Sequence, residues 1–359
     1  MEKKLPINVH FNEEDWQRIE RDWKAWWAGE LDRPLLTLEV TEPKASDCWT
    51  HLSRYGLETP IEQILDDSEL TLETTWWMGD AYPKWWVNYG AGVMAAFLGS
   101  KLTWRPDTTW FWPLEGVTSL EEIQPRYDAE NPWWVRVRET TRQAVERWGE
   151  QVLVGITDLG GNLDILASLR GSEKLLFDLS DNPDEVDRLV KEITALWLRY
   201  YDELYTITSA AGHGNACWGP VWSPGTGYML QSDFSYMISP RMFKHFVLPD
   251  LEACCAHLDY GFYHMDGKGE LPHRDQMLKI ERLRGIQWQP GDGQPMAEDW
   301  PEVLQKIRSG GKLVQVFVTA QGALDIRKEL GGKGFLLHIV NETLTPEQGK
   351  AFLETFEAA

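Results

Sequence analysis

Short apolar segments alternate with amphipathic segments along the C-terminal two thirds of the chain. The apolar segments are rich in Val, Ile, Leu and Phe, which is typical of strands buried on both faces. Helical spacing of apolar residues follows each segment, and Pro183 and Pro301 stand where helices would begin. The pattern predicts strands near residues 35, 152, 215, 261, 285, 312 and 334, and one more within 86–112.

This alternation indicates parallel strands joined by right-handed crossovers. Eight such units suit a closed (β/α)8 TIM barrel, and an open doubly wound sheet is the alternative. No GxGxxG sequence follows the first strand, which argues against dinucleotide binding. We therefore expect an α/β fold in which residues 1–359 form a single barrel domain.

The N-terminal third adds a helical, Trp-rich extension to this pattern. A helix is expected over residues 12–30, with Asn12 as its N-cap, and further helices over 60–75 and 132–149. The chain has 20 Trp residues, several of them in adjacent pairs such as Trp26-Trp27. Adjacent residues point in different directions, so one of each pair needs a second surface to pack on. Core packing with a homodimer contact is one interpretation, and an aromatic pocket for a sugar, a flat ring or a methylated cation is the other.

Charge and composition exclude several classes of partner. The formal net charge of −21 disfavours nucleic acid and anionic membranes. No apolar run approaches the roughly 18 residues that span a bilayer, and residues 1–6 lack the apolar core of a signal peptide. Four Cys residues, none in a CxxC pair, do not form a disulfide framework. We expect a cytoplasmic protein that acts on a small molecule.

Polar residues at the predicted strand ends are the candidates for chemistry, because barrel enzymes place their sites there. His264 and Asp266 follow the strand near 261 and suit an acid/base pair or partial metal ligation. Asp158 is a further catalytic candidate, although a helix N-cap is an equal interpretation of that residue. Two His and a carboxylate would suit zinc or another divalent metal, and the conjectured ligands are His264, Asp266, His338 and Glu342. The predicted substrate-binding residues are Trp218, Trp222, Asp233, Gln289, Asp292 and Asn341.

Several segments of the chain resemble the uroporphyrinogen decarboxylase superfamily, in consistent order and over nearly the whole length. The matching segments are Gly29 to Pro34, Gly160 to Gly171, Leu175 to Pro183, Leu230 to Pro249 and His264-Met265-Asp266-Gly267. The resemblance implies a (β/α)8 barrel. It also implies one of two activities, porphyrinogen decarboxylation or methyl transfer between corrinoid proteins and thiols or other acceptors.

The chain departs from both branches of that superfamily. It lacks the Arg-rich N-terminal segment that grips substrate carboxylates in the decarboxylases, which makes it a poor receptor for a multiply anionic tetrapyrrole. The methyltransferases hold zinc with a His-x-Cys pair and a later Cys. Here the pair is His264-x-Asp266, and residues 337–342 contain no Cys. The resemblance therefore implies an altered site with nitrogen and oxygen ligands, or no metal.

Three functions follow. The first is a methyltransferase or demethylase-type enzyme that passes a methyl group from a small methylated substrate to a corrinoid, carried by a partner protein, or to tetrahydrofolate. The second is a hydrolase or lyase for a carbohydrate or an aromatic acid, using carboxylates and Trp platforms at the barrel mouth. The third is a non-catalytic binding protein on an inherited barrel, which the absence of the family's Cys ligands favours.

Overall fold

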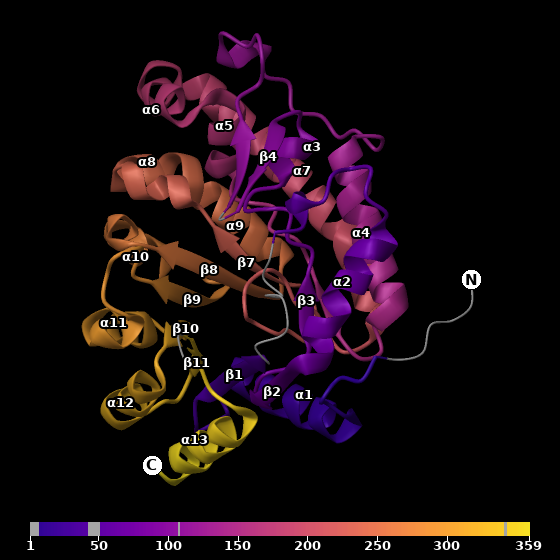
Figure 1. Ribbon diagram of the computed structural model, residues 1–359. Coiled ribbons are helices and arrows are strands. Elements are labelled where there is room, and N and C mark those ends of the chain that lie inside the picture. Colours follow the sequence, from indigo (N-terminus) through magenta and orange to yellow (C-terminus); the bar gives the residue numbers. More distant parts are fainter. Residues whose placement is uncertain (1–6, 42–50, 107, 341–342) are drawn as a thin grey trace.

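A seven-stranded sheet forms the centre of the protein, which is described from a computed structural model covering residues 7–41, 51–106, 108–340 and 343–359 (Figure 1). Its strand order is β2-β1-β11-β10-β9-β8-β7, and all neighbours are parallel except β2, which pairs antiparallel with β1. The strands are β1 Leu35–Thr41, β2 Thr75–Gly79, β7 Gly227–Gln231, β8 Tyr260–Asp266, β9 Leu283–Gln289, β10 Leu313–Val318 and β11 Phe335–Ile339.

Two smaller sheets accompany the central one. Strands β3 Lys84–Trp86 and β6 Leu153–Gly155 form a parallel pair, and β4 Lys101–Arg105 and β5 Thr108–Trp112 form an antiparallel hairpin. An isolated parallel bridge joins Ile156, just after β6, to Cys217. Among the described residues, hydrogen-bonded strand pairs do not join β3 and β6 to the seven-stranded sheet. The fold is therefore a mixed α/β fold with a largely parallel sheet.

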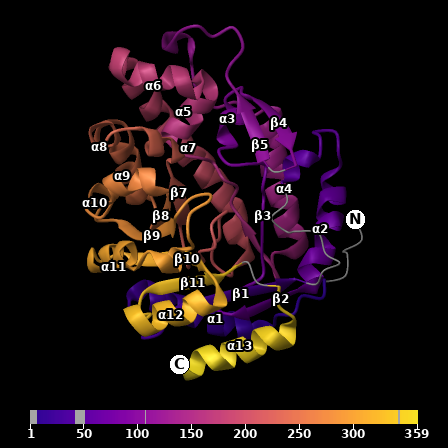
Figure 2. The ribbon, with the colours of Figure 1, turned by 60° about the vertical axis from the view of Figure 1, so that its left-hand side comes forward.

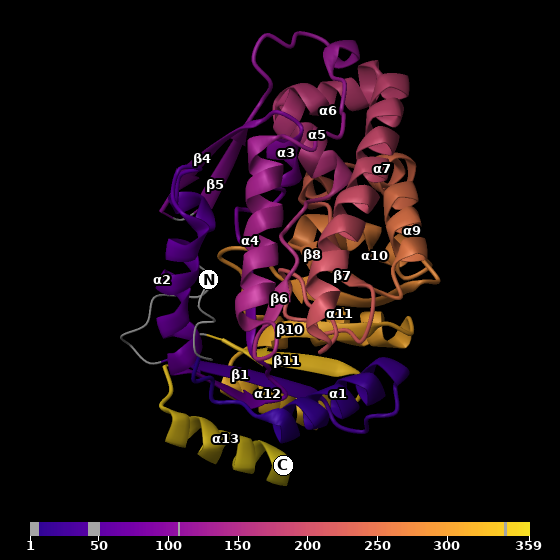
Figure 3. The ribbon, with the colours of Figure 1, turned by 90° about the vertical axis from the view of Figure 1, so that its right-hand side faces the viewer.

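Helices surround these strands. Helices α8 to α12 lie in a row beside β7 to β11 (Figure 2), and the long helices α4 and α7 pack side by side (Figure 3). No helix in the described ranges is both long and apolar enough to cross a membrane. The helices are α1 Glu13–Ala28, α2 Ile61–Thr74, α3 Met94–Phe97, α4 Pro132–Trp148, α5 Asn162–Arg170, α6 Ser172–Asp181, α7 Pro183–Thr208, α8 Pro240–Met242, α9 Leu248–His257, α10 Arg274–Met277, α11 Pro301–Ser309, α12 Ala320–Leu330 and α13 Pro346–Ala358.

Most of the predicted elements are present, and two strands are misplaced. The parallel strand expected within 86–112 is β3, which begins at Lys84, and residues 101–112 hold the antiparallel hairpin instead. The helices expected over 12–30, 60–75 and 132–149 correspond to α1, α2 and α4, and the Asn12 side chain caps α1 as predicted. The strand expected near 215 is wrong, because residues 215 and 217 make only isolated bridges there and the strand is β7. Gly, Pro and Ser residues precede β7 and make the segment read as a loop.

Helix α1 covers the end of the sheet at which the parallel strands begin. The Trp26 indole donates to the carbonyl of Phe335, the first residue of β11, over 3.1 Å. The Trp27 ring meets Tyr260, the first residue of β8, with centroids 5.0 Å apart. Both adjacent Trp residues are therefore buried core residues. The opposite end of the sheet, where the strands finish, is the end that carries the polar side chains described next.

Candidate functional site

One row of paired residues across the sheet is polar. Gln231 of β7 pairs with His264 of β8, His264 with Gln287 of β9, and Gln287 with Gln315 of β10. Residues in register across a sheet face the same side, and so do residues two positions further along each strand. Asp266 is therefore the next residue on this face of β8. The alternate residues Tyr263 and Met265 point the other way and are fully buried.

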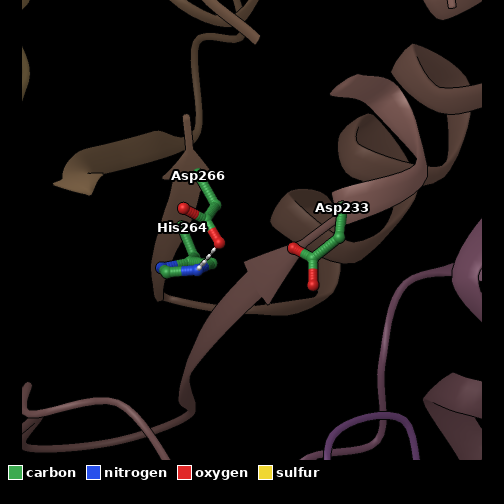
Figure 4. Close-up of side chains that lie close together, drawn as sticks. All are labelled: Asp233, His264 and Asp266. Carbon is green, nitrogen blue, oxygen red and sulfur yellow. Dashed lines mark ion pairs between the residues drawn. The ribbon is translucent and has the colours of Figure 1, made fainter. Parts of the chain in front are cut away.

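Three side chains converge where β7 and β8 end (Figure 4). Asp233 begins a short 3-10 helix, Asp233–Met237, directly after β7, and His264 and Asp266 are the last inward residues of β8. His264 Nε2 lies 3.7 Å from Asp266 Oδ2. One potential ligand atom from each of the three residues lies within 4.8 Å of the others. The sequence predicted His264 and Asp266 as a pair at a strand end, and Asp233 as a substrate-binding residue in a segment read as a loop rather than as a third ligand.

The ring of His264 is held from the side opposite Asp266. Its Nδ1 is hydrogen bonded to Oε1 of Gln287, and the amide nitrogen of Gln287 donates to Oε1 of Gln315. Both glutamines are buried. The Trp218 ring meets the imidazole edge-on, with centroids 5.3 Å apart. These contacts fix the plane of the imidazole and direct Nε2 toward the two carboxylates.

Two charges decide the protonation of His264. Burial lowers the pKa of a histidine, but the neighbouring Asp266 and Asp233 carboxylates outweigh burial and raise the pKa of His264 to about 9. The imidazole therefore carries a positive charge at neutral pH when no other cation is present.

Two further carboxylates lie behind the cluster. Asp158 is 3% exposed and accepts backbone N–H bonds from Gly160 (2.9 Å) and Gly92 (3.3 Å). Asp164 accepts from the backbone N–H groups of Asp233 (3.1 Å) and Phe234 (2.7 Å), so it fixes the loop that carries Asp233. Burial, together with the charge of Asp233, raises the pKa of Asp158 to about 7 and that of Asp164 to about 7. Asp158 is thus a buried loop anchor close to Asp233.

Glu270 supports the backbone of the site. It is fully buried, accepts a hydrogen bond from the Tyr263 hydroxyl over 2.8 Å, and accepts from the backbone N–H of Asp266 over 3.3 Å. Burial raises the pKa of Glu270 well above its ordinary value. Glu270 therefore fixes the end of β8 through one side-chain and one backbone hydrogen bond.

A pocket of about 310 Å³ opens beside Asp233 and Asp266. Gly267 turns the chain at its edge with φ +83°, and a Cβ atom at this position would come within 2.8 Å of the Tyr236 ring. A glycine is required there, which explains the Gly in the His-Met-Asp-Gly sequence. The lining residues are Asp233, Tyr236, Asp266, Gly267, Lys268, Pro290, Gly291, Asp292 and Gln294.

The other predicted site residues have different positions. Asp292 lines the pocket, and the Gln289 carbonyl accepts from the Gly267 N–H over 2.7 Å. Trp222 is not brought to this site, because its carbonyl accepts from the Trp27 indole beside the start of β8. The predicted residues Asn341 and Glu342 lie outside the described residues.

His338 does not join the cluster either. It is buried, and its Nδ1 lies 2.9 Å from the hydroxyl of Thr37. Burial and the nearby Lys84 ammonium lower the pKa of His338 to about 3. The sequence placed His338 correctly at the end of the last strand, but β10 and β9 separate that strand from β8, and the structure does not bring His338 beside His264.

Gln287, Gln315, Asp164 and Tyr236 were missed in the sequence. A glutamine in an otherwise apolar strand, as in Leu313-Val314-Gln315-Val316, is the signal that could have shown the first two, because a buried amide needs a polar partner.

Comparisons with known proteins give a likeness of fold. No protein-family model matches the chain, and no curated protein matches it. Among solved structures, the chain is similar to a methyltransferase from Methanosarcina mazei, with a TM-score of 0.61 and 13% sequence identity. The match covers 95% of this chain and 98% of that one. The two proteins therefore share a fold over nearly their full lengths.

Proposed function

We propose that this chain is a methyltransferase or demethylase-type enzyme that takes a methyl group from a small methylated substrate and passes it to a corrinoid or folate acceptor. The observation that carries the proposal is the convergence of His264, Asp233 and Asp266 beside a small pocket. The similarity of fold to a methyltransferase supports it.

The proposal includes a closed barrel. Strands β1, β3, β6, β7, β8, β9, β10 and β11 give eight strands in chain order, which is the number that a (β/α)8 barrel needs. Closure would place β6 beside β7, and the bridge from Ile156 to Cys217 lies on that side. Strand β2 pairs with the other edge of β1, so it would stand between β1 and β3. We further propose that residues 1–359 form one such domain, a divergent member of the uroporphyrinogen decarboxylase superfamily.

The chemistry of methyl transfer explains the need for these residues. When a methyl group leaves a heteroatom, the carbon–heteroatom bond breaks, a bond from carbon to the acceptor forms, and the heteroatom keeps the electron pair. That pair is stabilised by a proton or by a metal ion. His264 with Asp266 can provide the proton, and the same two residues with Asp233 can bind an ion.

The size of the pocket limits what it holds. About 310 Å³ is at the lower end of the range for ligand pockets, roughly 300–1,000 Å³, so it suits a small substrate. The methyl acceptor would then approach from the open side. We extend the proposal to a homodimer, which the exposed Trp110 and Trp112 of β5 favour.

Glycoside hydrolysis, one form of the alternative, requires a defined separation between two carboxyl groups. The potential ligand atoms of Asp233 and Asp266 lie within 4.8 Å. Retaining glycosidases separate their carboxyl groups by about 5–5.5 Å and inverting ones by roughly 6.5–9.5 Å.

The test mixes the enzyme with reduced corrinoid and a broad panel of methylated amines, thioethers and aromatic methyl ethers. Formation of the methylcobalamin spectrum is the expected result, and His264→Ala should abolish it. His245→Ala replaces an exposed histidine outside the site and should retain it. A second assay replaces corrinoid with tetrahydrofolate and measures methyl-tetrahydrofolate. If no substrate methylates either acceptor, the proposal is contradicted.

A further inference from the structure

We propose that Asp233, His264 and Asp266 bind one divalent first-row transition metal ion, Zn²⁺ or Mn²⁺ by their chemistry. This deepens the proposed function, because the ion would be the cation that stabilises the leaving heteroatom. It differs from the ligand set expected from the sequence, since Asp233 takes the place given there to His338 and Glu342.

The three donors already lie near ligand spacing. Bonds of about 2.0–2.2 Å to one ion place neighbouring ligand atoms roughly 3–3.5 Å apart. His264 Nε2 and Asp266 Oδ2 are 3.7 Å apart, and the third donor lies within 4.8 Å. Asp233 is exposed at the start of its 3-10 helix, so a rotation of its side chain can close the remaining distance.

The carboxylates are available as ligands. Among the described residues, no hydrogen-bond donor engages the carboxylate oxygens of Asp233, and the partner of the Asp266 carboxylate is His264 itself. Asp164 holds the backbone of Asp233 instead of its side chain. The structure therefore fixes the positions of both residues and leaves their oxygens directed toward the shared space (Figure 4).

His264 is oriented as metal-binding histidines are. A ligating imidazole commonly donates its second N–H to a fixed acceptor, which sets the tautomer. Here Nδ1 meets the amide oxygen of Gln287, and Gln287 is itself fixed by Gln315. Nδ1 is then the protonated nitrogen, and the lone pair of neutral His264 lies on Nε2, which faces the carboxylates.

The ligand set determines the class of ion. One imidazole and two carboxylates suit Zn²⁺, Fe²⁺, Co²⁺ or Mn²⁺, and no thiolate among the described residues belongs to the cluster. Three protein ligands beside an open pocket leave a coordination position for substrate, as in catalytic zinc sites. His338 is a poor ligand, because Lys84 places a positive charge near it.

The experiment measures metal binding without substrate. Chelator-treated protein is titrated calorimetrically with Zn²⁺ and with Mn²⁺, and bound metal is counted by elemental analysis after dialysis. We expect one ion per chain, lost in Asp233→Asn, His264→Ala and Asp266→Asn. The matched controls are His245→Ala and Asp259→Asn, which change exposed residues elsewhere and should bind as the wild type does. Thermal melts followed by circular dichroism establish that each variant is folded.

Two more readouts separate ligands from structural residues. Gln287→Leu should weaken binding by about 10–100-fold while the protein stays folded, because the orientation of the imidazole is lost. The Co²⁺-loaded protein should show only weak visible bands, without the strong near-ultraviolet band of a cobalt–thiolate bond.

Wild-type protein that binds no ion, Asp233→Asn that binds like the wild type, or a thiolate band would each overturn the proposal. Because no methyl transfer is measured here, an ion bound by all three residues in a protein that transfers no methyl group would refute the proposed function and leave the metal site intact.

Discussion

Replacing Asp158 with Asn should make the protein more stable at neutral and alkaline pH. The carboxyl is buried beside Asp233, and its pKa is raised from 3.8 to about 7. Between these values the folded protein keeps a proton that the unfolded chain has lost, so the wild type loses stability as pH rises through this range. At ~1.36 kcal/mol per pH unit, the loss amounts to about 4 kcal/mol above pH 7.

The asparagine variant escapes this loss. Its amide oxygen still accepts from the N–H groups of Gly92 and Gly160, but it carries no charge. The difference in free energy of unfolding between the variant and the wild type should therefore grow with pH, by about 4 kcal/mol between pH 4 and pH 8. Any free-energy cost of burying the amide is the same at pH 4 and at pH 8, so it does not alter the predicted increase between the two pH values.

The assay is urea unfolding of both proteins in chelator-containing buffers at several values between pH 4 and pH 8. A difference that stays constant over this range would contradict the prediction, since it would show that Asp158 titrates alike in the folded and unfolded chains. If the variant is more stable but no longer transfers methyl groups, the carboxylate of Asp158 is needed for activity although it destabilises the protein.

Two further predictions concern buried residues whose hydrogen bonds stabilise the fold around the site. Asp80→Ala removes the buried carboxylate that accepts from both guanidinium nitrogens of Arg33, at 2.6 and 2.9 Å, and from the backbone N–H of Leu36. Because the Arg33 side chain is 41% exposed and keeps Asp22 as a partner, the free energy of unfolding in chemical denaturation should fall by about 1–2 kcal/mol; an unchanged free energy would contradict this. Tyr228→Phe removes a hydroxyl that donates to the Thr157 carbonyl (2.9 Å) and accepts from the Leu159 N–H (2.8 Å). It should cost about 1–3 kcal/mol, and unchanged hydrogen-exchange protection of the 157–159 loop would contradict this.

The sequence was most informative where the residues of the site lie on a single strand. His264 and Asp266 lie two residues apart on β8, so their shared face follows from strand geometry alone. Asp233 joins them through the pairing of β7 with β8, and β7 was read as a loop. The grouping of Asp233 with His264 was therefore out of reach.

His338 shows the reverse error. It has the same residue type and the same position at a strand end as His264, and these properties suggested a shared ligand role. Burial lowers the pKa of His338, and the Lys84 ammonium, brought from a distant strand, lowers it further, whereas two carboxylates lie beside His264. Charge that arrives through tertiary contacts decided the two histidines differently, which local pattern cannot predict.

The most direct test of the account is whether Asp233, His264 and Asp266 form one site. Crystals soaked with Zn²⁺ and measured on both sides of its absorption edge would show this. We predict one anomalous peak per chain at about 2.0–2.2 Å from ligand atoms of all three residues. A peak at His338 instead, or none between the three side chains, would contradict the account.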